Sequence, residues 1–85
     1  MDKHPSLSGK EICRILEKDG FVFVRQTGSH RIFQKSMHEE TITIPVPVHS
    51  NTPLKKGTLH AILKKARISR EKLTFLLSVL GIFLL

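Results

Sequence analysis

Apolar side chains recur at helical spacing in three segments of the chain. Residues 8–20 open with the pattern of a capping box, Ser8 followed by Glu11 three positions later, which predicts a helix that begins there and closes at Gly20. A second helix is predicted to begin near residues 54–58, and Ser69 is predicted to cap a third, shorter one. The side chains expected to face inward are Ile12, Ile15 and Leu16, then Leu59, Ile62, Leu63 and Ala66, then Leu73, Leu76, Leu77 and Leu80.

Between the first two helices the pattern changes to that of short strands. Residues 21–26 are β-branched and aromatic, which is typical of a strand. Residues 30–35 mix apolar with cationic side chains, as in a strand with only one buried face. A glycine turn at residues 27–29 is expected to join these two strands.

A third strand is predicted from residues 41–44, whose alternation directs Ile42 and Ile44 inward. Pro45 and Pro47 either end this strand or confine it to a sheet edge, and residues 36–40 are expected to form the loop before it. The order helix, three strands, helix, helix predicts an α+β fold. In this fold the helices cover one face of a three-stranded antiparallel sheet.

The length of the chain allows one domain. Residues 1–85 are expected to hold a single small core within residues 8–73, with residues 74–85 as an apolar C-terminal extension. That extension is too short to span a bilayer, so it is expected to pack on the domain or on another protein. The single cysteine, Cys13, cannot form an internal disulfide, and no signal peptide opens the chain, so we expect a cytoplasmic location.

The charge balance is strongly basic. The chain has 14 Lys and Arg against 7 Asp and Glu, a formal net charge of +7. Such an excess indicates a polyanionic partner, most commonly nucleic acid, because each neutralised phosphate releases counterions. Lys55 and Lys56 lie where the start of a helix already favours a phosphate. A solvated cationic surface without such a partner is the alternative.

The Gly-Ser-His element at residues 28–30 is the best candidate for chemistry. A histidine at the first position of a strand, beside a glycine turn, is exposed enough to reach a ligand. In RNA cleavage without a metal, a base takes the proton of the ribose 2′-hydroxyl, which attacks the neighbouring phosphate, and imidazole suits that step. Arg25, Arg31 and Lys35 are candidates to stabilise the charge on the phosphoryl oxygens. An ordinary surface histidine is the alternative for His30.

Metal and thiol chemistry find little support in the spacing of the residues. The histidines are scattered along the chain at His4, His30, His38, His49 and His60. No close pair of histidines or cysteines has the spacing of metal ligands, so we expect no metal ion and no cofactor. Cys13 lies beside the apolar stripe of the first helix, and it is expected to be a small core residue rather than a nucleophile.

Taken in order, several of these motifs resemble the HicA toxins of bacterial and archaeal toxin–antitoxin pairs. The matching elements are Ser8-Gly9-Lys10-Glu11, Gly20-Phe21, Val24-Arg25-Gln26-Thr27-Gly28-Ser29-His30, Pro47-Val48-His49, Leu54-Lys55-Lys56-Gly57-Thr58-Leu59 and Ile62-Leu63-Lys64. The combination of Gly-Ser-His after an Arg-Gln strand with Gly-Thr-Leu at the second helix carries the resemblance. Arg67 departs from it, because the family favours glycine there, and this predicts a rearranged end of the second helix.

The resemblance implies a fold like that of double-stranded-RNA-binding domains and a metal-independent endoribonuclease that cuts mRNA, with His30 as the catalytic residue. The expected RNA-binding residues are Arg25, Gly28, Ser29, Lys35, Lys55 and Lys56. The implied partner is a HicB-like antitoxin that masks the active site in a hetero-oligomer, whereas the toxin alone is expected to be a monomer or weak dimer. A double-stranded-RNA-binding module without catalysis is the alternative function.

Overall fold

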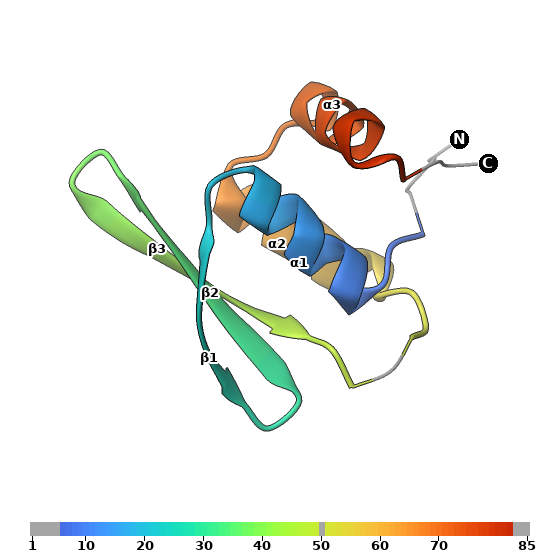
Figure 1. Ribbon diagram of the computed structural model, residues 1–85, viewed down its shortest axis with the longest axis horizontal. Coiled ribbons are helices and arrows are strands. Elements are labelled where there is room, and N and C mark those ends of the chain that lie inside the picture. Colours follow the sequence, from blue (N-terminus) through green and yellow to red (C-terminus); the bar gives the residue numbers. More distant parts are fainter. Residues whose placement is uncertain (1–5, 50, 83–85) are drawn as a thin grey trace.

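The computed structural model describes residues 6–49 and 51–82, which form three helices and three strands (Figure 1). In chain order these are α1 (Gly9–Lys18), β1 (Val22–Thr27), β2 (His30–Met37), β3 (Glu40–Pro47), α2 (Lys56–Ala66) and α3 (Arg70–Leu80). The helices lie on one side of the sheet, where α1 contacts β1 and β3, α2 contacts β3, and α3 contacts α1 (Figure 1). The predicted α+β arrangement is confirmed.

The first helix begins at the predicted capping box. The Ser8 N–H donates to Glu11 Oε1 at 2.9 Å, and the Glu11 N–H donates to Ser8 Oγ at 3.2 Å. Two backbone donors that the helix start leaves unpaired are thereby satisfied. Gly20, just past the helix, has a φ of 102°, which residues with a Cβ rarely adopt. The chain can therefore turn at once from α1 into β1.

The connection between β2 and β3 is shorter than the sequence suggested. The predicted loop over residues 36–40 is wrong, because β2 runs to Met37 and β3 begins at Glu40. Only His38 and Glu39 form the turn, and both have positive φ, 50° and 67°. Positive φ at both residues is the conformation of a type I′ hairpin turn, which matches the strand twist and is usually marked by Asn or Gly. The sequence His-Glu carries no such signal.

The third strand lies at an edge of the sheet and continues through both prolines. The Val48 N–H donates to the Ser29 carbonyl at 2.8 Å, and in the antiparallel register of β2 and β3 every second residue from Val48 repeats this pairing. Pro45 and Pro47 occupy the intervening positions, which point away from β2. Their missing N–H groups therefore cost the sheet no hydrogen bond, and the predicted edge position is the outcome found.

An apolar core fills the space between the sheet and the helices. Its largest fully buried side chain is Phe33 of β2, which is 1% exposed. The predicted inward residues of the helices are buried, apart from Leu63 and Leu80, which are half-buried. Helix α3 continues past residue 73, where the predicted core segment ends, and its Leu76 and Leu77 belong to the same core. Residues 83–85, the end of the apolar segment, lie outside the described residues.

The end of β3 lies directly against the start of α1. A Cβ placed on Gly9 would lie 1.8 Å from the carbonyl oxygen of Pro47, so only glycine fits there. The Leu54 N–H donates to the Leu7 carbonyl at 2.8 Å, which joins the segment before α2 to the segment before α1. The start of α1 and the segment before α2 therefore lie beside each other, next to the end of β3.

The expected rearrangement at the end of α2 is wrong. Arg67 keeps the left-handed conformation that glycine favours at a helix end, with φ 60° and ψ 39°, and its N–H still bonds to carbonyls of the last turn. Its guanidinium Nη2 lies 3.1 Å from Glu40 Oε2 at the start of β3. This exposed ion pair accompanies a backbone conformation that is unfavourable for arginine.

Candidate active site

His30 is the first residue of β2, the central strand of the sheet. Its partners are Thr27 on β1 and Pro47 on β3, so pairing on both sides holds its backbone. The two-residue turn before it has Gly28 at φ 58°, and Gln26 Nε2 donates to the Gly28 carbonyl at 3.0 Å. A Cβ on Gly28 would meet nothing within 4 Å, so glycine is needed there for its backbone conformation rather than for space.

The imidazole lies on the face of the sheet that the helices leave open. Side chains alternate between the two faces along a strand, and Phe33 belongs to the core on the helix side. His30 therefore faces the other way, together with Ile32 and Gln34. On this open face Gln34 Nε2 donates to Thr43 Oγ1 at 3.2 Å. His30 itself is exposed, as a residue that meets a ligand must be.

A bulge in β1 brings Arg25 to the same face. Phe23 pairs with Phe33, yet Arg25 pairs with Ile32, so Val24 is an extra residue in the ladder. In a regular register Arg25 would lie opposite Arg31 and face the helices. With the bulge it shares the open face with His30, one pair away along the strands, and it is exposed there.

A second cationic region lies at the start of α2. Lys55 is its N-cap residue, the Lys55 side chain makes no capping hydrogen bond, and the first turn carries no acidic residue. Lys55 and Lys56 are both exposed. A pocket of about 240 Å³ opens here, lined by Pro47, His49, Thr52, Pro53, Leu54, Lys55 and Thr58. Because Pro47 is the cross-strand partner of His30, the pocket adjoins the histidine.

Lys35 lies apart from His30. It is on the helix-facing side of β2, five residues along, and its Nζ donates to the Asp19 carbonyl at 2.5 Å and lies 3.4 Å from Asp19 Oδ2. Lys72 Nζ lies 2.6 Å from Asp19 Oδ1, and the Asp19 side chain is only 4% exposed. The Lys35 ammonium also lies 5.4 Å from the centre of the Phe21 ring. Lys35 thus joins the end of α1 to the sheet.

The remaining reactive groups do not form a second centre. Cys13 is buried in α1, and burial raises the pKa of its thiol, partly offset by the nearby Arg31 guanidinium. It packs as a protonated core residue. Among residues 6–49 and 51–82 no group of three His, Cys, Asp or Glu side chains is placed to hold a metal ion, and His4 lies outside this range. The same part of the chain contains no helix with the length and apolar character needed to cross a membrane.

Of the seven predicted site residues, Arg25 and His30 share the open face, and Gly28 and Ser29 form the turn before His30. Lys55 and Lys56 lie at the adjoining helix start, whereas Lys35 lies apart from the others. An exposed imidazole can exchange a proton with a bound group, while a guanidinium and the N–H groups of a helix start hold an anion. A phosphodiester fits this combination. The bulge at Val24 had no signal in the uniformly apolar run of residues 21–24.

Comparison with protein-family models matches residues 9–68 to the family described as the HicA toxin of bacterial toxin-antitoxin. The matched segment runs from the first residue of α1 to just past the end of α2. It contains every residue of the candidate site. No curated protein matches the chain.

Proposed function

The chain belongs to the HicA toxin family of bacterial toxin–antitoxin systems, and from that premise we propose that it is a metal-independent endoribonuclease in which His30 transfers the proton. Membership makes it the toxin of a pair and implies a cognate antitoxin as its partner. The proposal rests on one observation: the exposed His30, whose strand pairs on both sides, has Arg25 on the same face of the sheet because of the bulge in β1.

The proposed reaction is a transesterification within the RNA backbone. The His30 imidazole accepts the proton of a ribose 2′-hydroxyl while that oxygen forms a bond to the adjacent phosphorus. The bond from phosphorus to the 5′-oxygen of the next nucleotide breaks, the leaving oxygen takes a proton from water, and the His30 imidazolium gives its proton to the hydroxide that this leaves. Arg25 stabilises the negative charge that gathers on the phosphoryl oxygens. The products are a 2′,3′-cyclic phosphate and a 5′-hydroxyl.

Lys55 and Lys56 are proposed to bind phosphates of the same strand next to the reacting one. Their location at an N-terminal helix end that has no acidic residue in its first turn favours a phosphate through the helix dipole. Gly28 and Ser29 position the histidine and let the RNA backbone approach the turn. In the cell, a HicB-like antitoxin would silence the enzyme by covering this open face in a hetero-oligomer in the cytoplasm.

The test is cleavage of a purified mRNA by the wild type and by two matched variants, His30→Asn and His38→Asn. His38 lies at the opposite end of β2 in a left-handed position that asparagine tolerates, so it controls for loss of an imidazole. We expect His30→Asn to lose about 10²- to 10⁴-fold in rate and His38→Asn to keep the wild-type rate. Cleavage should persist in EDTA and stop at a 2′-deoxy substitution. Equal cutting by His30→Asn would refute the assignment.

The second candidate function is RNA binding without cleavage, which the cationic start of α2, with no acidic residue in its first turn, favours on its own. It predicts that the wild type binds duplex RNA but yields no products, and that His30→Asn binds as the wild type does. Replacing Lys55 and Lys56 with alanine should weaken binding to all RNA sequences and reduce the salt slope by about 1.8, at roughly 0.9 per phosphate contact. Fluorescence anisotropy at several salt concentrations measures the binding, and analysis of the RNA ends separates the two functions, because only the first yields cyclic-phosphate ends.

A further inference from the structure

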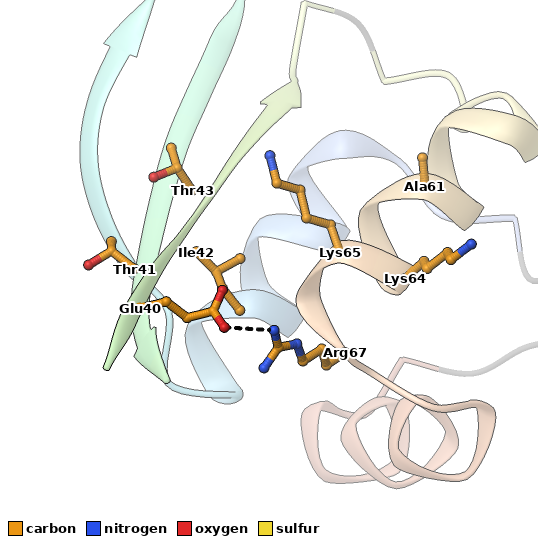
Figure 2. Close-up of a pocket in the computed structure, with 8 residues that line it drawn as sticks. All are labelled: Glu40, Thr41, Ile42, Thr43, Ala61, Lys64, Lys65 and Arg67. Carbon is orange, nitrogen blue, oxygen red and sulfur yellow. Dashed lines mark hydrogen bonds and ion pairs between the residues drawn. The ribbon is translucent and has the colours of Figure 1, made fainter. Parts of the chain in front are cut away.

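A groove runs between β3 and α2, on the side of the molecule away from β1. Its first part has a volume of about 650 Å³ and lies between residues 40–43 of β3 and residues 61–67 in the second half of α2 and just past its end. A second part of about 420 Å³ continues along α2 toward Gly57, and the two share Ala61 and Lys65. Figure 2 shows Ile42 between the strand and the helices and Lys65 extending from α2 toward β3.

The wall formed by β3 is an unpaired strand edge. The hydrogen bond from Val48 to Ser29 sets the phase of the ladder, so Thr41 and Thr43 point their N–H and C=O groups away from β2. Among residues 6–49 and 51–82 no strand covers this edge, because the sheet order is β1-β2-β3. Such alternating donors and acceptors are the pattern to which another extended backbone pairs.

The rest of the edge is closed to pairing. Pro45 and Pro47 have no N–H to offer, and the Pro47 carbonyl lies against Gly9 at the start of α1. Prolines at an edge commonly protect a sheet from unwanted partners. Here they stop short of Thr41 and Thr43, so two complete pairing positions stay open.

The other wall is cationic. Lys64 and Lys65 line the groove, and within residues 6–49 and 51–82 neither forms an ion pair. Arg67 closes one end, with its charge shared with Glu40. A strand added beside β3 would thus lie next to the Lys65 ammonium group, which extends toward β3 (Figure 2), with Lys64 also in the lining of the groove.

We propose that this groove binds an extended, acidic segment of a partner protein, which joins the sheet as a fourth strand beside β3. The alternative occupant is RNA, and two features disfavour it: the alternating backbone donors and acceptors of the edge match a peptide, and Ile42 and Ala61 make the floor of the groove partly apolar. The proposal is independent of catalysis at His30, which lies at the other end of β2.

The test uses NMR of the isotope-labelled full chain with three probes. These are a capped seven-residue peptide of alternating glutamate and valine, its lysine–valine counterpart, and a single-stranded RNA oligonucleotide. In the free chain the N–H of Thr43 should exchange with solvent at least about tenfold faster than those of Ile42 and Ile44, which bond to β2. The glutamate peptide should slow exchange at Thr41 and Thr43 and shift the resonances of Lys64 and Lys65.

Two matched pairs of variants sharpen the result. Thr43→Pro removes an outward N–H at a position equivalent to the native Pro45. It should lower the affinity for the glutamate peptide by about tenfold, whereas Thr43→Val should change this affinity by less than about twofold. Lys65→Glu should also lower the affinity by about tenfold, and Lys18→Glu, the same charge change on α1, should leave it unchanged.

Three outcomes would overturn the proposal. The first is the absence of shifts at Thr41 and Thr43 at about 2 mM glutamate peptide, a concentration that detects even millimolar affinity. The second is equal binding of the lysine peptide, which would remove the charge argument. The third is that the RNA, rather than the peptide, perturbs Thr41 and Thr43. Shifts confined to β1, the other sheet edge, are a case of the first outcome, because they would show that the peptide pairs with β1 and not with β3.

Discussion

Gly9 and Gly57 look alike in the sequence, since each lies at the start of a helix and beside a lysine, yet the structure predicts opposite effects of replacing them with alanine. At Gly9 a Cβ would lie 1.8 Å from the Pro47 carbonyl oxygen, and about 1.2 Å of backbone movement is needed to reach the shortest contact that real Cβ atoms show. At Gly57 nothing lies within 4 Å of the new Cβ.

The magnitudes follow from packing and helix propensity. Forcing a methyl group into a packed backbone contact costs about 1–3 kcal/mol, and we expect the upper end at Gly9 because both partners are main chain. Alanine recovers less than about 1 kcal/mol as the better helix former, so Gly9→Ala should lower the free energy of unfolding by about 2–3 kcal/mol. For a domain of this size that corresponds to a fall in Tm of roughly 10–20 °C.

The assay is thermal and urea unfolding of the wild type, Gly9→Ala and Gly57→Ala, followed by circular dichroism. Gly57→Ala should be neutral or stabilise by up to about 1 kcal/mol, because only the propensity term acts. If Gly9→Ala is as stable as the wild type, or if both variants lose stability equally, then the start of α1 does not lie against the end of β3 and the reasoning fails.

Three further predictions concern groups outside the candidate site. Arg67→Gly should raise the free energy of unfolding by about 0.5–1 kcal/mol, because relief of the left-handed backbone exceeds the loss of an exposed ion pair with Glu40; a lower urea midpoint would contradict this. Lys35→Met should lower the free energy of unfolding by about 1–3 kcal/mol, because the buried Asp19 carboxylate loses a partner. RNA cleavage by the folded fraction should stay unchanged. A selective loss of RNA affinity would instead place Lys35 in the site. Burial raises the pKa of the Cys13 thiol, so alkylation by iodoacetamide at pH 8 should be at least about tenfold slower in the native than in the urea-unfolded chain. The same shift makes stability decline as the pH rises above the thiol's ordinary pKa, because the unfolded chain releases its proton first; equal alkylation rates, or stability that rises there, would count against it.

The sequence determined the elements and their buried faces. The capping box at Ser8, the cap at Ser69 and the inward stripes of the helices are all found in the structure, since they depend on residues within one or two turns of each other. The Gly-Ser-His turn was likewise predictable, because a glycine with positive φ leaves a local signal.

Where charged side chains point was decided by tertiary structure. Arg25 shares a face with His30 only because of the bulge at Val24. One extra residue in the ladder moves every later side chain of the strand to the opposite face, and the composition of the strand gives no sign of it. Lys35 looked equivalent to Arg25 in the sequence, yet it lies on the other face beside Asp19, a residue at the end of α1.

Tertiary structure also decided how Gly9 differs from Gly57 and whether the edge of β3 is covered. Whether Gly9 meets a carbonyl, and whether Thr41 and Thr43 lack a neighbouring strand, depends on which distant segments fold against them. Local periodicity specifies the side of an element that is buried. Register and the approach of segments far apart in the chain arise only from packing the whole molecule, and these decide which residues share a site.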